Sequence, residues 1–410
     1  MMEKRFEEAK SIFEDYFGKE EMSNLSFYSS PGRTEIGGNH TDHQHGEVLA
    51  AALDIDTIAV VRRSNSNMIR IQSEGYPPFE VDINDVDEPK PQEKGRTKAL
   101  IRGVIKYLKD RNYRITGGFD AYVISDVEPG SGLSSSASFE VLIGTIVSGE
   151  FNDSKIEPEV IAKAGQYAEN VFFGKPCGLM DQMACAIGGV VHIDFRNLDK
   201  PVVKRLDFDL LENGLSLCIT NTGGSHSDLT DEYKSVTDEM KSVADIIKTK
   251  TTTLLDVTAD DIYTNIDVLR REAGDRAILR ALHFIDENQR VRREAEAIRL
   301  HDIELFLQLI NDSGNSSYKY LQNVYVAANP KSQNVALALA VTEEFIGRTD
   351  QRQKAASRVH GGGFAGTIQT FISSDKAEEY KKLMDRIFGE DSCQIVNIRQ
   401  QGGIKVEFHK

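Results

Sequence analysis

The chain has little of several features that point to particular classes of protein. It has four cysteines among 410 residues, at positions 177, 185, 218 and 393, too few and too scattered for a disulfide framework or a paired-cysteine zinc site. Basic side chains are outnumbered, with 49 Lys and Arg against 64 Asp and Glu, so the net charge is −15 at pH 7. Because nucleic-acid binding needs an excess of Lys and Arg, we expect no nucleic-acid partner.

Long apolar runs are also missing. No stretch of about 18 apolar residues occurs, so we expect no membrane span and no membrane partner. The N-terminal segment has no apolar signal core, and its apolar residues recur at helical spacing, which predicts an amphipathic helix ending at Gly18. We therefore expect the protein in the cytoplasm. With 40% hydrophobic and 28% charged residues, the composition is that of a globular protein of two or three domains.

Apolar patterning predicts a mixture of strands and helices in both halves of the chain. Strands are expected at 54–63, 68–73, 119–125, 190–195, 215–221 and 364–372, and in the C-terminal segments CQIVNI and IKVEF. Helices are expected at 97–111, 134–149, 157–172, 229–248, 273–300, 302–311, 334–346 and 375–388. No repeating βαβ pattern emerges, so the predicted fold class is α+β. A boundary near 200–215 is predicted to separate an N-terminal domain, 1–210, from a C-terminal domain, 211–410.

A glycine- and serine-rich segment, 128–138, precedes a predicted helix. Gly130 and Gly132 permit tight backbone with positive φ, and the run Ser134–Ser136 follows. A loop that opens a helix directs free N–H groups and the positive end of the helix dipole at one point, which suits a phosphate. The alternative is a plain helix N-cap after a turn, but three consecutive serines favour the phosphate. The GxxxxGK[ST], HRD and DFG signatures of other nucleotide-binding proteins are absent.

A second segment, 30–46, is dense in directional polar groups. It contains Arg33, Glu35, Asn39, His40, Asp42, His43 and His45 between glycines. Such a loop is poor as core and well suited to recognising a polyhydroxyl compound. A solvated turn and a zinc site formed by Asp42, His43 and His45 are the alternatives, although nothing nearby completes a metal site.

Two further segments carry weaker signals. Glycines at 361–363 and 366 lie beside a predicted strand and allow close approach of another backbone or a ligand. Glu169 lies on a predicted helix, and Asp181 follows a Pro/Gly loop. A carboxylate held in this way can act as a base or charge stabiliser, and one nearby on a helix can hold Mg²⁺.

In this order the motifs resemble those of the GHMP small-molecule kinases, and of the galactokinase family in particular. GRTEIGGNHTD resembles the family signature GR-x-N-x-I-G-E-H-x-D, PGSGLSSSA resembles P-x-G-x-G-L-S-S-S-A, and GGGFAG resembles G-x-G-F-G-G. The segments PCGLMDQ, TNTGGSHSDLTDEY, HFIDENQRV and LFLQLINDS also look like their counterparts. The likeness runs from about residue 25 to 405.

The resemblance implies a two-lobed GHMP kinase fold, with a ribosomal S5 domain 2-like N-terminal domain and a ferredoxin-like C-terminal domain. It implies ATP-dependent phosphorylation of the 1-hydroxyl of galactose, with ATP and Mg²⁺ as cofactors, and leaves the oligomeric state open. Arg33 and Asp181 are then the catalytic pair, and Ser136 and Glu169 lie at the Mg²⁺. The implied sugar contacts are Asn39, His40, Asp42, Gly178 and Tyr233. The implied triphosphate contacts are Gly130, Ser131, Gly132, Leu133, Ser134, Ser135 and Ser136.

Departures from the family pattern fall mainly in the polar segment 30–46. Asn39 stands where Glu is usual, Glu35 where Asn is usual, and His43 where Tyr is usual. A kinase for another monosaccharide, such as arabinose or N-acetylgalactosamine, is therefore an alternative. A non-enzymatic sugar sensor is a second alternative, which the intact Arg33, Asp181 and Glu169 disfavour. Asp181 has two possible roles, base or electrostatic positioner, because a neighbouring Arg lowers the pKa of a carboxyl group.

Overall fold

The computed structural model describes residues 2–128, 130, 132–223, 229–247 and 253–408. The chain forms two compact units, each built from several stretches. Unit 1 consists of Met1–Arg33, Ala52–Gly189 and Arg399–Lys410, and unit 2 of Thr34–Ala51 and Val190–Ile398. This division differs from the predicted boundary at 210/211, because two long strands near the N-terminus contribute residues to both units.

The larger sheet has the strand order β12-β1-β2-β5-β3-β4. Its strands are β1 Leu25–Gly37, β2 Glu47–Arg63, β3 Met68–Ser73, β4 Phe79–Asp82, β5 Phe119–Ser125 and β12 Ile404–Val406. β2 pairs antiparallel with β5, and β3 pairs parallel with β5. In unit 2, β6 Val190–Asp194 pairs antiparallel with the start of β2, and β7 Val202–Leu206 pairs with β6.

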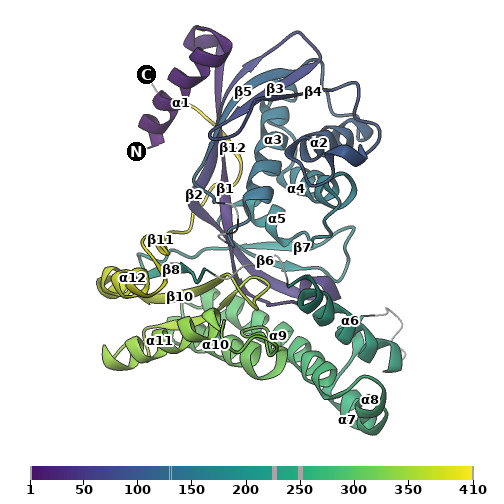
Figure 1. Cartoon of the computed structure of the whole chain (residues 1–410), viewed down its shortest axis with the longest axis vertical. Coiled ribbons are helices and arrows are strands. Elements are labelled where there is room, and N and C mark those ends of the chain that lie inside the picture. The colour runs from purple at the N-terminus through teal and green to yellow at the C-terminus, as the bar shows by residue number, and fades with distance from the viewer. Residues whose placement is uncertain (1, 129, 131, 224–228, 248–252, 409–410) are drawn as a thin grey trace. The chain divides into compact units, whose positions relative to one another are not determined.

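Helices cover both faces of the sheet in unit 1. The amphipathic helix α1 Met2–Phe17 packs Phe6 and Phe13 against Ile58 and Val60 on one face. Figure 1 shows the other helices of this unit on the opposite face. They are α2 Thr97–Asp110, α3 Ser135–Phe151, α4 Pro158–Tyr167 and α5 Met180–Ile187, with a π-helical turn, Ala168–Phe173, after α4.

Unit 2 contains a four-stranded antiparallel sheet in the order β11-β8-β10-β9. Its strands are β8 Leu215–Asn221, β9 Ala356–His360, β10 Thr367–Ser373 and β11 Cys393–Val396. Because side chains alternate along a strand, Ile368 and Ile372 of β10 pack in a core with α11 and α12, whereas Phe371 contacts Phe306 of α10. The helices are α6 Thr230–Ile247, α7 Ala259–Thr264, α8 Ile266–Glu272, α9 Asp275–Arg299, α10 Ile303–Ser316, α11 Asn334–Arg348 and α12 Ser374–Phe388.

The predicted α+β class and most of the predicted elements are confirmed, including both 119–125 and 215–221 as strands. The largest difference is β1, because the sequence predicts a polar loop where the structure has the second half of this strand. Pro31 and the glycines suggested that loop, yet β1 is almost entirely buried. Gly32 makes room for the Leu133 carbonyl, since a Cβ at Gly32 would lie 3.2 Å from that oxygen.

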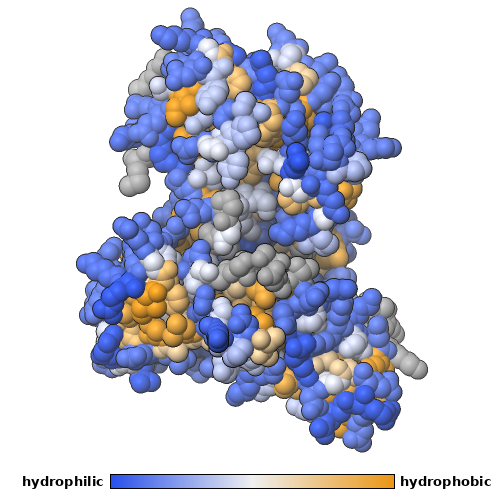
Figure 2. Space-filling model, in the orientation of Figure 1, coloured by the Kyte–Doolittle hydropathy of each residue, from blue (hydrophilic) through white to orange (hydrophobic). Residues whose placement is uncertain are grey.

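The surface seen in Figure 2 is mainly hydrophilic. Apolar side chains gather on it over α11 and α12, where Leu337 and Ile387 are exposed. None of the helices within the described ranges combines the length and the apolar composition that a membrane crossing requires.

Candidate active site

In unit 1 the serine loop leads directly into α3, as predicted. Gly130 and Gly132 have φ of +83° and +79°, and Ser134 is left-handed with φ of +58°. Ser134 occupies the N-cap position of α3, but its hydroxyl makes no capping hydrogen bond. It donates instead to Oδ2 of Asp181. The Ser134 side chain therefore does not act as a plain helix N-cap. Ser131 lies outside the described residues.

Arg33 and Asp181 form a two-point ion pair in unit 1. Nε of Arg33 donates to Oδ1 of Asp181 over 2.7 Å, and Nη2 donates to Oδ2 over 2.9 Å. Nη1 of Arg33 donates to the Gly132 carbonyl over 2.6 Å, and the Arg33 amide donates to the Leu133 carbonyl over 3.1 Å. The end of β1, the serine loop and α5 are thus fastened to one another.

The surroundings of Asp181 act on its pKa in both directions. Burial raises the pKa, but the charge of Arg33 and the hydrogen bonds from Arg33 and Ser134 outweigh burial, so the pKa lies below its ordinary value. The carboxylate keeps about 30% of its side-chain surface exposed. It is therefore an ionised acceptor that a ligand can reach, and a weak base.

A carboxylate cluster lies behind the start of α3. Oγ of Ser136 donates to Oε1 of Glu169 over 3.3 Å. Nε2 of Gln182 donates to both Oε2 of Glu140 and Oε2 of Glu169, over 3.0 and 3.2 Å. Burial, followed by the charge of Glu169, raises the pKa of Glu140. Ser136 and Glu169 thus offer two hard oxygen donors side by side, the type that Mg²⁺ prefers.

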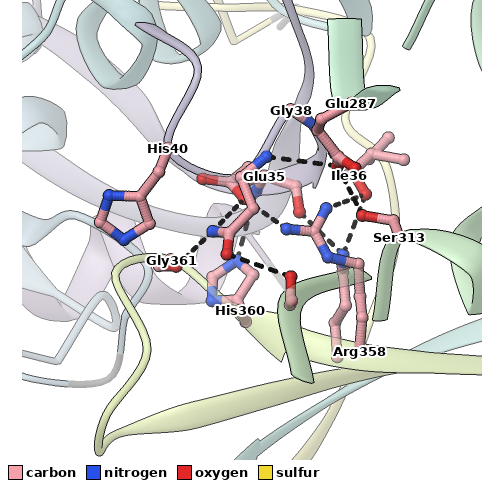
Figure 3. A network of polar contacts seen from close by, with 12 residues as sticks. Glu35, Ile36, Gly38, His40, Glu287, Ser313, Arg358, His360 and Gly361 are labelled. Carbon is pink, nitrogen blue, oxygen red and sulfur yellow. Dashed lines mark hydrogen bonds and ion pairs between the residues drawn. The ribbon is translucent and has the colours of Figure 1, made fainter. Parts of the chain in front are cut away.

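In unit 2 the polar loop is held by two buried charged side chains, Arg358 and Glu287 (Figure 3). Arg358 of β9, fully buried, donates from Nη2 to Oε1 of Glu35 over 2.6 Å and from Nη1 to the Ile36 carbonyl over 2.6 Å. Glu287 of α9 accepts from the amides of Gly38 and Asn39 over 3.2 and 3.4 Å. A buried Arg thus has its charge paired, and the loop backbone is held from two elements.

Asn39 is fully buried, and each polar capacity of its amide is used by the protein. Its Nδ2 donates to Oε1 of Glu35 over 3.0 Å and to the Gly361 carbonyl over 2.6 Å. Its Oδ1 accepts from Nδ2 of Asn323 over 2.8 Å and from Oγ of Ser317 over 3.3 Å. An amide has two donors and two acceptor sites, so no capacity is left over.

Two histidines of the loop, His40 and His43, are neutral. Burial lowers the pKa of His40, and it lowers that of His43 to about 3. Nε2 of His40 donates to the Gly362 carbonyl over 2.9 Å, so Nδ1 of His40 is the acceptor for Nε2 of His43 at 3.3 Å. Asp42 is partly exposed, and its Oδ1 accepts from the His43 amide over 2.8 Å.

The C-terminal glycine motif makes the close approaches that its sequence predicts. A Cβ on Gly362 would lie 2.4 Å from the Tyr233 ring, and one on Gly363 would lie 2.2 Å from the Asn323 carbonyl. The hydroxyl of Tyr233 donates to the Gly363 carbonyl over 2.9 Å. Tyr233 therefore belongs with the polar loop in unit 2, whereas the predicted sugar contact Gly178 lies on an exposed loop of unit 1.

Sequence reasoning missed the acidic residues of α9 and α3. Glu287, Glu294 and Glu140 are fully buried, yet in sequence they are ordinary helical glutamates. The spacing of seven between Glu287 and Glu294 places both on one helix face, which is the only local signal. Nowhere in the described part of the chain do three or more His, Cys, Asp or Glu side chains gather in a way that could hold a metal ion.

Comparisons with known proteins agree with this arrangement. The chain matches the model of the GHMP kinases N terminal domain over residues 99–189 and that of the galactokinase galactose-binding signature over residues 11–63. It is 30% identical to a galactokinase of Actinobacillus pleuropneumoniae, covering 93% of this chain and 91% of the relative. It is 29% identical to the galactokinase of Bacillus subtilis strain 168, covering 93% of both.

Solved structures share the fold. A galactokinase of Lactococcus lactis, complexed with galactose, matches with a TM-score of 0.81 at 23% identity, covering 98% of this chain and all of that one. A mevalonate kinase of Methanococcus jannaschii matches with a TM-score of 0.64 at 16% identity, covering 93% of this chain and all of that one. The predicted GHMP kinase fold is thereby confirmed.

Proposed function

Because the chain belongs to the galactokinase family of the GHMP kinases, we propose that it transfers the γ-phosphate of ATP to the 1-hydroxyl of galactose. The products are galactose 1-phosphate and ADP. The use of ATP follows from the kinase family. The observation that carries the proposal is the two-point pair of Arg33 and Asp181, joined by Ser134 at the first turn of α3.

Phosphoryl transfer needs alignment and charge neutralisation more than covalent help from the protein. The first turn of α3 supplies N–H groups and the positive end of the helix dipole for the triphosphate, because the Ser134 side chain does not cap them. Arg33 stabilises the charge that develops near the transferred group. Its guanidinium also keeps Asp181 ionised.

Asp181 accepts a hydrogen bond from the sugar hydroxyl that attacks the phosphate. Its low pKa makes it a weak base, so it orients the hydroxyl first and receives the proton only as the new P–O bond forms. The loose transition state of phosphoryl transfer tolerates such late proton removal. The lowered pKa thus supports a positioning role that ends in proton acceptance.

Mg²⁺ is expected beside the triphosphate, held by Oγ of Ser136 and a carboxylate oxygen of Glu169. When bound, the ion neutralises phosphate charge. The residues fit this role because Ser136 and Glu169 already lie within hydrogen-bonding distance. Two protein ligands suffice, since Mg²⁺ usually keeps phosphate oxygens and waters as its other ligands.

On the sugar side, Asp42 is the best-supported contact. Its carboxylate is partly exposed, whereas Asn39 is fully buried. A carboxylate that accepts two vicinal hydroxyls selects sugar stereochemistry, because a sugar lacking one of them leaves an acceptor unpaired.

The test is ATP consumption by the wild-type chain across a panel of monosaccharides, with the position of the product phosphate determined by NMR. We expect galactose to be preferred. Asp181→Asn should lower kcat by roughly a hundredfold or more without weakening ATP binding. Asp42→Asn should raise the galactose Kd by roughly tenfold or more while sparing ATP. The exposed Asp375→Asn at the start of α12 is the control, and should match wild type.

Each failure has its own meaning. A near-wild-type kcat for Asp181→Asn contradicts the assigned catalytic role. Preference for arabinose or N-acetylgalactosamine contradicts the substrate but keeps the kinase. Binding of galactose and ATP without turnover by the wild-type chain is the result expected of a sensor.

A further inference from the structure

Residue 39 stands where the family signature has a glutamate, and the structure shows what its amide does instead. Asn39 is fully buried, and its side chain makes four hydrogen bonds, all to the protein. The two acceptors for its Nδ2 are Oε1 of Glu35, on the preceding strand, and the Gly361 carbonyl, in the glycine motif. A sugar hydroxyl could bind the amide only by displacing one of these partners.

The backbone at Asn39 is held as firmly as its side chain. The Asn39 amide donates to Oε1 of Glu287 over 3.4 Å, and the Asn39 carbonyl accepts from Nε2 of His283 over 2.9 Å. Both partners come from α9. Burial lowers the pKa of His283 to about 4, so its ring is neutral and its Nδ1 accepts from Ser316.

The side-chain amide of Asn39 joins the polar loop to the glycine motif. Asn39 donates to the Gly361 carbonyl, and His40 donates to the Gly362 carbonyl over 2.9 Å. Asn323 bridges the two segments, because its Nδ2 donates to Oδ1 of Asn39 and, over 3.1 Å, to the Gly362 carbonyl. Three side chains thus fix two successive carbonyls of a loop in which Gly361 and Gly363 have positive φ.

We propose that Asn39 is a positioning residue, which holds the Gly361–Gly363 loop against the polar loop and does not itself bind the sugar. Its hydrogen bond to Glu35 needs one donor and one acceptor. An Asn at 35 with a Glu at 39, the order of the family signature, also supplies one of each. The exchange therefore keeps the pair and moves the negative charge to residue 35, where Arg358 takes it over 2.6 Å.

The proposal rests on the proposed function, since kinase activity is its main readout. The experiment compares wild type with Glu35→Asn, Asn39→Glu and the double exchange. Asn39→Glu sets two carboxylates against each other and turns the contact with the Gly361 carbonyl repulsive, while Glu35→Asn leaves the buried Arg358 without its anion. Each single variant should lower kcat roughly tenfold or more, with the galactose Kd from calorimetry changed less than about threefold. The double exchange restores the donor–acceptor pair between residues 35 and 39, but neither the hydrogen bond to the Gly361 carbonyl nor the anion of Arg358. Its loss of kcat should therefore be smaller than the two single losses combined.

A milder variant covers the case in which the exchanges do not fold. Asn323→Ala removes the bridge without adding charge, and should lower kcat while leaving the KM for galactose near wild type. Asn311→Ala is its matched control, because the amide of Asn311 also bonds two backbone groups, at Ala355 and Ser357, neither of which belongs to the Gly361–Gly363 loop or the polar loop. It should leave kcat unchanged.

Three results overturn the proposal: losses that add in the double exchange, a galactose Kd that rises in step with the loss of kcat, or an Asn323→Ala variant equal to wild type. Melting temperatures, followed by circular dichroism, separate this failure from that of the proposed function. If the wild-type chain does not phosphorylate galactose, the pairing still predicts that each single exchange lowers the melting temperature and that the double exchange lowers it by less than the sum of the two decreases. Decreases in melting temperature that add in the double exchange contradict the pairing.

Discussion

Glu294 of α9 is a buried carboxyl group whose ionised form the surrounding structure does not stabilise. The side chain is fully buried, and neither oxygen has a hydrogen-bond partner among the described residues. Burial raises its pKa to about 8, and the charges of Glu287 and Glu35 raise it too, against the lowering effects of Arg358 and Arg290. At neutral pH the folded protein therefore carries this group protonated.

The raised pKa of Glu294 makes the free energy of unfolding depend on pH. The unfolded chain ionises Glu294 near pH 4.5, while the folded chain holds the proton until about pH 8. Between these values the folded state binds more protons, so its free energy of unfolding falls as pH rises, by about 1.4 kcal/mol per pH unit. At pH 7 the accumulated loss is about 3 kcal/mol, a large part of the stability of an ordinary domain. Above pH 8 the loss is constant.

Glu294→Gln removes the titration and keeps the shape. Urea unfolding of wild type and variant, followed by circular dichroism at pH 5.5 to 8.5, measures the difference in unfolding free energy. The free energy of unfolding of the variant, minus that of wild type, should rise by about 1.4 kcal/mol per pH unit up to about pH 7.5. This difference should level off above pH 8. The new amide adds a constant cost, so the slope is the readout. Curves that run parallel at all pH values refute the reasoning.

The control lies two residues along the same helix. Glu296 is half-exposed, and its hydrogen bond from Arg299 lowers its pKa. Glu296→Gln should therefore leave the slope nearly unchanged, or shift it slightly in the opposite direction at acid pH. An equal slope change in both variants means that the effect comes from removing any charge from α9.

Two further predictions concern single contacts. Arg33→Met should raise the pKa of Asp181, because burial is then opposed only by the hydrogen bond from Ser134 and the charge of Lys175; ¹³C NMR titration of the Asp181 carboxyl measures this, and an unchanged pKa contradicts the ion pair. Gly37→Ala should destabilise the protein by about 1–3 kcal/mol, because the new Cβ would lie 1.9 Å from an oxygen of Glu294. Combining Gly37→Ala with Glu294→Ala should recover most of that loss in urea unfolding, and additive losses would contradict the clash.

Local sequence patterns predicted the elements best where one face of an element is buried. The strand 119–125 and the helix 334–348 have clear periodicity and were predicted nearly at their observed bounds. β1 was missed because Pro31, Gly32 and Gly37 resemble loop residues. These glycines serve packing instead, since Gly32 faces the Leu133 carbonyl and Gly37 faces Glu294. Such contacts join residues far apart in the chain, and no local sequence pattern predicts them.

The candidate site divides in the same way. The ordered motifs were enough to name Arg33, Asp181 and the serine loop. The buried groups behind them were not predictable, because Glu140 and Glu287 have the same local pattern as exposed helical glutamates. Only the fold shows that Glu140 neighbours Glu169 through Gln182 and that Glu287 holds the backbone of the polar loop.

The exchange at residues 35 and 39 and the titration of Glu294 are linked by charge. Glu35, Glu287 and Glu294 lie near two cations, Arg358 and Arg290, so the buried charges balance only if one carboxyl is neutral. Glu294 is that group, because Glu287 and Glu35 both accept hydrogen bonds while Glu294 accepts none.

Glu35→Asn should therefore lower the pKa of Glu294, since it removes an anion and leaves the positive charge of Arg358 less compensated. In urea unfolding of Glu35→Asn with and without Glu294→Gln, the pH above which the gain from Glu294→Gln levels off should move below 8. Asn39→Ala is the comparison, because it alters the same pair without removing a charge, and should leave that pH near 8. If Glu35→Asn also leaves it near 8, the negative charge at residue 35 is not what keeps Glu294 protonated, and burial with the charge of Glu287 accounts for it.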